Sequence, residues 1–165
     1  LRTWRAMCPE LQALWPEAER PEHWEGVTME NGRVVELELV EYDLTGAVPA
    51  EIGRLSALRV LHLSGNQLTS LPAEIGQLTS LEKLYLIRNQ LTSVPAEIGQ
   101  LTSLRALYLI SNRLTSVPVA EIGQLTSLRE LRLVYNRLTM ESAAILRGGL
   151  FPAGCHVVLV KTCHE

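Results

Sequence analysis

A nearly identical segment of about 23 residues recurs along the middle of the chain, and this repetition constrains the fold more than any other feature. Leu58–Ser80 reads LRVLHLSGNQLTSLPAEIGQLTS, and Leu81–Ser103 reads LEKLYLIRNQLTSVPAEIGQLTS. A third copy occupies Leu104–Ser127, and a fourth begins at Leu128. A unit this short cannot enclose a core of its own, so such copies are stable only when they stack on one another.

One asparagine marks each copy and fixes the length of the repeat. It recurs as Asn66, Asn89, Asn112 and Asn136, at intervals of 23, 23 and 24 residues. Residues 34–57 form an earlier, divergent copy in which Tyr42 takes the place of the asparagine. The sequence therefore predicts about five repeats over residues 34–139.

Within a copy, two different patterns follow one another. Leucines alternate with variable residues in the LxxLxL stretch, which indicates a short strand with its leucines turned inwards. The segment PAEIGQL, with proline expected at the first helical position, indicates a short helical or 3-10 turn. Stacked copies would thus form an α/β solenoid, a short right-handed arc with a parallel concave sheet and helical turns on the convex side.

The recurring asparagines are predicted to form a structural ladder. The chain must turn where each strand ends, and the turn leaves backbone groups without partners inside the stack. An asparagine amide can donate and accept at once, so a column of these side chains can satisfy such groups.

The two ends of the chain do not follow the repeat and are expected to cover the open ends of the stack. Residues 1–33 are predicted to be a helical cap, with an amphipathic helix over Trp4–Trp15 that Pro9 could break. Residues 140–165 are predicted to be a second cap. It would contain a helix over Met140–Leu146, stopped at Gly148-Gly149, and an edge strand over His156–Val160.

Two cysteine–histidine pairs near the end of the chain invite other interpretations. Cys155-His156 and Cys163-His164 contain zinc-ligand residue types, but their spacing matches no familiar finger, and no metal site is predicted. A disulfide between Cys155 and Cys163 is the alternative. It requires the intervening strand to fold back, because an extended chain rises about 3.3 Å per residue.

Charge and composition exclude some classes of partner. The net charge of −3 gives no basis for a nucleic-acid or anionic-membrane partner, and no apolar run is long enough to span a bilayer. The charge is unevenly distributed, with 11 acidic and 5 basic residues in residues 1–57, a net charge of −6. Three cysteines and no Asn-x-Ser/Thr sequon favour a cytoplasmic protein, while secretion stays open because the sequence begins without an initiator methionine.

The repeat form Asn-x-Leu-Thr-Ser-[Leu/Val]-Pro-x-x-Ile resembles that of intracellular leucine-rich-repeat proteins of the Ras-suppressor type. Plant Ras-group-related repeat proteins share this form. The first copy, with LTGAVPAEIGRL, resembles the repeats of plant receptor-kinase ectodomains. The segment Trp24–Val35 resembles the cap that precedes those repeats. Met29 stands where that cap usually has a cysteine, so the paired-cysteine staple is missing. The resemblance implies a horseshoe or short arc that binds protein ligands on its concave face.

Variable strand positions between and after the inward leucines should project from the concave side, where they are free to contact a partner. Tyrosine beside isoleucine and arginine is typical of protein-binding hot spots. Cross-strand tyrosines and isoleucines that only stabilise the sheet are the alternative. The predicted partner-binding residues are Glu38, His62, Tyr85, Ile87, Arg88, Tyr108, Ile110, Arg132, Val134 and Tyr135.

Three functions were compared on these grounds. A non-catalytic protein-interaction module, such as a signalling adaptor, is the leading hypothesis, and a monomer is favoured. The alternative is an extracellular receptor-type module that recognises a peptide or a glycan. An enzyme is not predicted, and no cofactor is expected, because the chain has no phosphate-binding loop, His-Glu-x-x-His run or nucleophile elbow.

Overall fold

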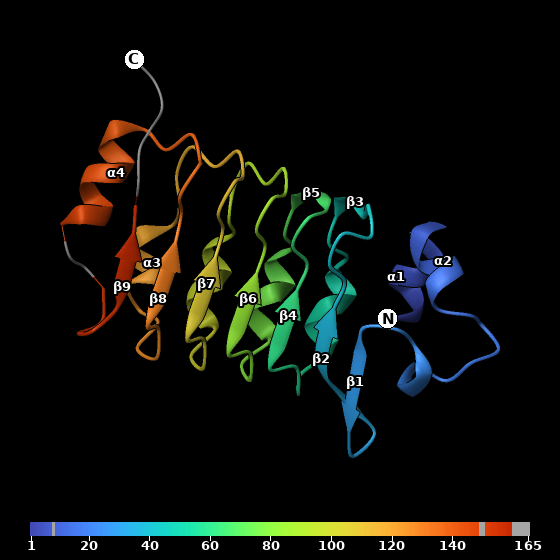
Figure 1. Ribbon diagram of the computed structural model, residues 1–165. Coiled ribbons are helices and arrows are strands. Elements are labelled where there is room, and N and C mark those ends of the chain that lie inside the picture. Colours follow the sequence, from blue (N-terminus) through green and yellow to red (C-terminus); the bar gives the residue numbers. More distant parts are fainter. Residues whose placement is uncertain (8, 149–150, 160–165) are drawn as a thin grey trace.

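The computed structural model describes residues 1–7, 9–148 and 151–159 and stacks the repeats side by side along one axis (Figure 1). Strands from successive repeats form one seven-stranded sheet in the order β1-β2-β4-β6-β7-β8-β9. The strands are β1 (Val27–Glu30), β2 (Arg33–Glu38), β4 (Val60–His62), β6 (Lys83–Tyr85), β7 (Ala106–Tyr108), β8 (Glu130–Arg132) and β9 (His156–Val158). All pairs from β2 onwards are parallel. This architecture confirms the predicted solenoid with a parallel sheet.

The return segments lie behind the sheet as short helical turns (Figure 1). They are η2 (Ala50–Arg54), η3 (Ala73–Gln77), η4 (Ala96–Gln100) and α3 (Val119–Ile122), while β3 (Thr45–Ala47) pairs with β5 (Gln67–Ser70) in a small second sheet. The proline was expected at the first helical position, and this was wrong by one residue. Pro72 is extended, with φ −77° and ψ 156°, and its carbonyl accepts the Ile75 N–H at 3.1 Å, so it caps the turn from outside.

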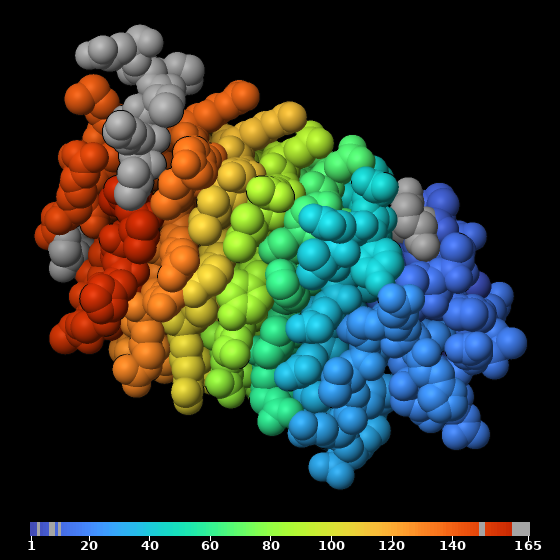
Figure 2. All heavy atoms as spheres, in the orientation of Figure 1, coloured from blue at the N-terminus to red at the C-terminus, as the bar shows by residue number. Residues whose placement is uncertain are grey.

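The core is a stack of leucine layers, each contributed by one repeat. Leu61, Leu84, Leu107 and Leu131 lie next to one another in the sheet and are fully buried. Burial of such a side chain contributes about 1.5–3 kcal/mol. Figure 2 shows each repeat as one slice of the molecule pressed against the next. Stability therefore comes from contacts between neighbouring slices.

Glycines in the helical turns allow these slices to approach closely on the convex side. A Cβ added at Gly76 would lie 2.6 Å from the Glu97 carbonyl oxygen, and one at Gly99 would lie 2.8 Å from that of Glu121. Neither glycine has a left-handed φ, so what these positions require is clearance. The recurring Ala-Glu-Ile-Gly motif thus sets the distance between adjacent turns.

The N-terminal end is covered by helices and an antiparallel hairpin. The chain forms helices α1 (Arg2–Met7) and α2 (Pro9–Leu14) on either side of residue 8, which lies outside the described residues and is where the predicted break would fall. Buried Trp15 and Trp24 stack with ring centroids 5.0 Å apart, and the Trp15 indole N–H donates to the Glu25 carbonyl at 2.9 Å. A 3-10 turn, η1 (Pro21–His23), leads into β1, which pairs antiparallel with β2. The repeat pattern of the sequence did not predict this hairpin.

At the other end, helix α4 (Met140–Arg147) and strand β9 follow the last repeat. Thr139 caps the helix by accepting the Ser142 N–H, and Gly148 follows its last residue. Gly149, Val160, Cys163 and His164 lie outside the described residues, and so do the disulfide and metal hypotheses that involve Cys163 and His164. None of the helices in the described part is long and apolar enough to cross a bilayer.

A column of asparagine side chains runs through the turns that follow the strands. The Asn89 amide nitrogen donates to the carbonyls of Leu63, one repeat back, and Leu86, while its oxygen accepts the Leu68 N–H. Asn66, Asn112 and Asn136 make the same kinds of contact in their own repeats. Asn66 also accepts the N–H of Tyr42, the residue at the asparagine position of the first repeat.

Asn89→Asp should therefore destabilise the solenoid strongly. The change keeps the oxygen acceptor, removes both N–H donations and places a carboxylate against two carbonyls, which should cost about 2–4 kcal/mol. Thermal unfolding should show a midpoint lower by about 4–15 °C. Gln90→Glu introduces the same charge one residue away and serves as the control. Equal losses in the two variants would contradict the ladder's role.

Candidate partner-binding face

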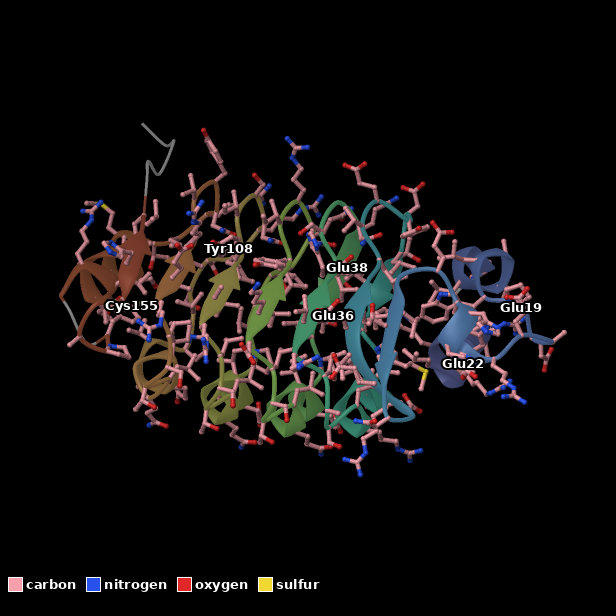
Figure 3. All side chains as sticks on the ribbon, turned by 60° about the horizontal axis from the view of Figure 1, so that its bottom comes forward. Glu19, Glu22, Glu36, Glu38, Tyr108 and Cys155 are labelled. Carbon is pink, nitrogen blue, oxygen red and sulfur yellow. The ribbon has the colours of Figure 1, made fainter. Side chains whose placement is uncertain are left out.

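The sheet face turned away from the helical turns carries parallel columns of variable side chains, of which Figure 3 labels Glu36, Glu38 and Tyr108. The strand register aligns the first column, here called the aromatic column: Glu38, His62, Tyr85, Tyr108 and Arg132. Two residues further along each strand lies the floor column: Val40, Ser64, Ile87, Ile110 and Val134. The next residue in each repeat forms the rim column: Glu41, Gly65, Arg88, Ser111 and Tyr135.

Side chains of the aromatic column stack on one another across four strands. His62 meets Tyr85 edge-on at 4.9 Å between ring centroids, and Tyr85 meets Tyr108 at 5.0 Å. The Arg132 guanidinium lies 4.7 Å from the centre of the Tyr108 ring. Each aromatic pair contributes about 0.5–1.5 kcal/mol beyond its buried area, so this column also stabilises the sheet. All four side chains stay half-exposed and present one face to solvent.

Glu130 fixes the C-terminal end of this stack. The Tyr108 hydroxyl donates to the Glu130 carboxylate, and Arg132 forms an ion pair with the same carboxylate at 3.3 Å. The hydrogen bond raises the pKa of Tyr108 and lowers the pKa of Glu130. At the other end, burial lowers the pKa of His62, and the Glu38 carboxylate opposes that shift. Tyr108 is thus held in the protonated, donating form.

The floor and rim columns enclose a shallow groove of about 330 Å³. Its lining residues are Val40, Glu41, His62, Ser64, Gly65, Ile87, Arg88, Ile110, Ser111 and Tyr135. The backbone hydrogen bonds of the parallel sheet continue beneath the groove. The backbone N–H of each rim residue donates to the carbonyl of the floor residue in the next repeat at 2.8–3.0 Å, for Glu41, Gly65, Arg88 and Ser111. The groove therefore has a fixed backbone.

Every rim residue has a left-handed backbone conformation. Besides Gly65 at φ 72°, the values are 61° for Glu41, 53° for Arg88, 56° for Ser111 and 57° for Tyr135. L-residues adopt this region at a cost of roughly 1–2 kcal/mol each, whereas glycine does so freely. This conformation was not predicted from the sequence, where the single glycine in the column, Gly65, was the available signal.

All ten predicted partner-binding residues lie on this face. The structure brings His62, Tyr85, Tyr108 and Arg132 into mutual contact and places Ile87, Ile110, Arg88 and Tyr135 around the groove. Glu38 and Val134 lie at opposite ends of their columns. Glu130 and Glu41 are not among the predicted partner-binding residues, because their contacts depend on residues in neighbouring repeats. Whether these residues bind a partner remains a prediction.

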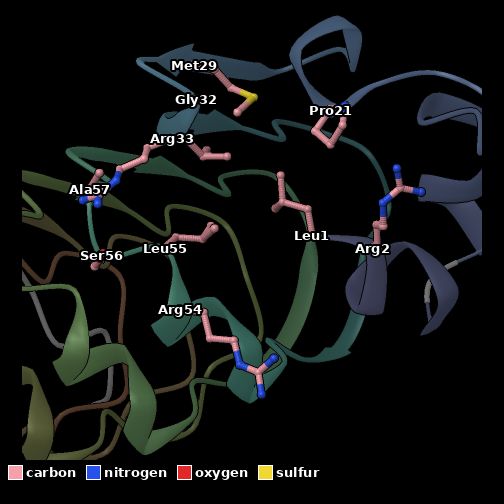
Figure 4. Close-up of a pocket in the computed structure, with 11 residues that line it drawn as sticks. Leu1, Arg2, Pro21, Met29, Gly32, Arg33, Arg54, Leu55, Ser56 and Ala57 are labelled. Carbon is pink, nitrogen blue, oxygen red and sulfur yellow. The ribbon is translucent and has the colours of Figure 1, made fainter.

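A second cavity, of about 460 Å³, lies where the N-terminal cap meets the first repeat (Figure 4). Its lining includes Arg2, Arg33 and Arg54. Their guanidinium groups point in different directions and do not converge on a common centre (Figure 4). Within the described ranges, no group of three or more His, Cys, Asp or Glu residues is placed to hold a metal ion. The sheet face is therefore the stronger candidate site.

Glu130→Gln should lower the pKa of Tyr108. The carboxylate stabilises the protonated phenol as an acceptor and repels the phenolate, so its removal favours ionisation. Tyrosine absorbance followed as the pH is raised should show one residue ionising earlier than in the unmodified protein. Glu25→Gln, which removes the acceptor of the Tyr42 hydroxyl, provides the matched comparison for a second tyrosine. Identical titration curves for Glu130→Gln and the unmodified protein would rule out this contact in solution.

A family model described as a leucine-rich repeat region matches residues 30–147. Among curated proteins, the LRR receptor-like serine/threonine-protein kinase FEI 2 of Arabidopsis thaliana is 43% identical over 58 residues. That match covers 33% of this chain and only 10% of the receptor kinase.

Solved structures extend the likeness over more of the chain. A chain in the BIR3–SERK2 complex of Arabidopsis thaliana aligns with a TM-score of 0.71 at 30% identity, covering 90% of this chain and 85% of that one. The LRR protein LIC12759 of Leptospira interrogans aligns with a TM-score of 0.63 at 43% identity, covering 68% of this chain and 28% of the other. Proteins from Arabidopsis thaliana and from Leptospira interrogans thus share this architecture.

Proposed function

Because this chain belongs to the leucine-rich-repeat family, we propose that it is a receptor-type recognition module that binds a protein partner on its concave face. The aromatic column is the observation that carries this proposal. Stacked, half-exposed tyrosines and an arginine held in place by Glu130 form a rigid surface of the residue types that dominate binding energy at protein interfaces. Because the stack is already ordered, little side-chain entropy would be lost on binding.

The receptor-type assignment is supported by the relatives. FEI 2 is named as a receptor-like kinase, and the aligned chain comes from a complex of BIR3 with SERK2. Since the chain spans only a tenth of FEI 2, the activity of that kinase as a whole is not transferred to it. The cap resembling receptor-kinase ectodomains agrees with this assignment.

An intracellular adaptor is the second candidate, and one observation favours it. Met29 stands at the usual cysteine position of the receptor cap, where a secreted domain would carry a disulfide. Intact mass measured with and without reductant on natively expressed protein separates the two candidates. The receptor-type proposal predicts an oxidised pair of the terminal cysteines Cys155 and Cys163, and an adaptor predicts reduced thiols.

The polar side chains of the face support a binding function without catalysis. The His62 ring packs against Tyr85, and the Ser64 hydroxyl accepts the Ile87 N–H at 3.2 Å. A histidine and a hydroxyl used in this way are not arranged as a base and a nucleophile, which must be within hydrogen-bond reach of each other.

Replacing both Tyr85 and Tyr108 with alanine should weaken partner binding at least tenfold. Truncation removes the centre of the aromatic column, and hot-spot residues typically contribute more than about 1.4 kcal/mol each. The melting midpoint should fall by less than about 10 °C, because four side-chain contacts are lost and the leucine core is untouched. The measurement is capture from native extract, followed by calorimetric titration with the identified, purified partner.

Thr92→Ala combined with Thr115→Ala is the control for this test. Both threonines are exposed, in the same repeats as Tyr85 and Tyr108 respectively, and they belong to none of the aromatic, floor and rim columns. Unchanged affinity in the tyrosine double variant, or equal loss in the threonine variant, would refute the proposed face.

A further inference from the structure

We infer that the groove between the floor and rim columns binds an extended peptide segment of the partner, and that Glu41 recognises a basic side chain in that segment. This inference rests on the proposed function and goes beyond it by assigning the chemistry of the ligand. The argument depends on the dimensions of the groove, the left-handed rim and the charges at its edge.

The dimensions fit a short extended chain. Adjacent strands lie about 4.8 Å apart, so Val40 and Ile110, three strand spacings apart, are separated by about 14 Å. An extended peptide covers that length with about four residues. Val40 is 38% exposed, and Ile87 and Ile110 are half-exposed, so alternate aliphatic side chains of a peptide would meet an aliphatic floor.

The rim retains side chains where glycine would relieve the backbone. Tyr135 is the clearest case, because it is 66% exposed at φ 57°. Among the described residues it forms no aromatic pair and no side-chain hydrogen bond. Neither packing nor the turn requires its ring. An aromatic wall for a ligand explains why a large side chain occupies this strained position.

Gly65 determines where the Glu41 side chain lies. A Cβ at Gly65 would lie 2.5 Å from the Glu41 Cγ, so the absence of a side chain there lets Glu41 lean along the rim towards the centre of the groove. Glu41 is exposed and forms no ion pair within the described part of the chain. Exposed Glu38 and Asp43 lie close to it in sequence and add to the negative charge. This end of the groove therefore complements a lysine or arginine.

Arg88 supplies the opposite charge two repeats further on. It too is exposed and without an ion pair among the described residues, and two strand spacings place it about 10 Å along the axis from Glu41. A peptide with a basic and an acidic residue about three positions apart, separated by aliphatic residues, would match both charges. A glycan offers no aliphatic side chains for the floor, so the groove favours a peptide.

The test begins with a phage-displayed library of linear octapeptides selected against the unmodified protein. Enriched sequences should combine aliphatic residues with a basic residue. One selected peptide is then synthesised, and its affinity is measured by fluorescence polarisation. Glu41→Lys should weaken its binding at least tenfold, whereas Glu19→Lys, on the exposed cap, should change it less than twofold. A peptide with its basic residue replaced by Glu should regain affinity for Glu41→Lys. The inference is overturned if no peptide is enriched, or if Glu41→Lys binds the selected peptide as tightly as the unmodified protein does.

Two glycine substitutions test the role of the rim separately from stability. Tyr135→Gly in the rim and Asn31→Gly in the turn between β1 and β2, outside the groove, both release a left-handed residue, so neither should lower the melting midpoint. Tyr135→Gly should weaken peptide binding at least tenfold and Asn31→Gly less than twofold. A lower midpoint together with weaker binding in Tyr135→Gly would show that the ring is structural. If peptides fail to bind while the Tyr85 and Tyr108 double variant still loses its protein partner, the groove assignment fails and the proposed function stands.

Discussion

The structure depends on satisfying backbone groups at the point where each strand turns towards the convex side. Leucine layers supply most of the favourable free energy, but burial is non-directional and would not hold the repeats in one register. The asparagine column adds direction: Asn112 donates to Leu86 in the preceding repeat and accepts the Leu91 N–H, so each turn is bonded to its neighbour. Buried polar groups left without such partners would cost about 1–3 kcal/mol each. Register between repeats, and hence the alignment of every exposed column, follows from this constraint.

The alignment of the repeats explains why the fold could be predicted from the sequence, and why the residues on the concave face could be predicted in part. Spacing of identical leucines and asparagines predicts strands, their order and the residues that face the concave side, because each copy repeats the same backbone. The Tyr108–Glu130 bond could not be predicted in this way, since it joins different columns of adjacent repeats. The N-terminal hairpin was missed because the short segment Val27–Glu30 carries no repeat signal. The left-handed rim was missed because only Gly65 among its five residues has the composition expected there.

The side chains that we propose for recognition also stabilise the sheet. Tyr85 contacts both His62 and Tyr108, so the cross-strand alternative considered from the sequence holds for part of its surface. The two roles are compatible, because stacking edges leaves the outer side of each ring free. A stack already ordered in the unbound protein loses less entropy on association than isolated, mobile side chains would. Packing of the aromatic column is thus a reason to expect tighter binding at this face.

The rim residues differ from the aromatic column in their effect on the free energy of the unbound protein. Stacked tyrosines stabilise the fold with or without a partner, whereas Arg88 and Tyr135 sit in a backbone conformation that costs free energy in the unbound protein. The turn needs that conformation at every repeat, and Gly65 shows that the column accepts the residue that avoids the cost. The leucine core offsets this cost in the unbound protein, while the exposed Tyr135 ring forms no aromatic pair or side-chain hydrogen bond among the described residues. The proposed division between residues for recognition and residues for the stack therefore rests on the strain along the groove more than on its shape.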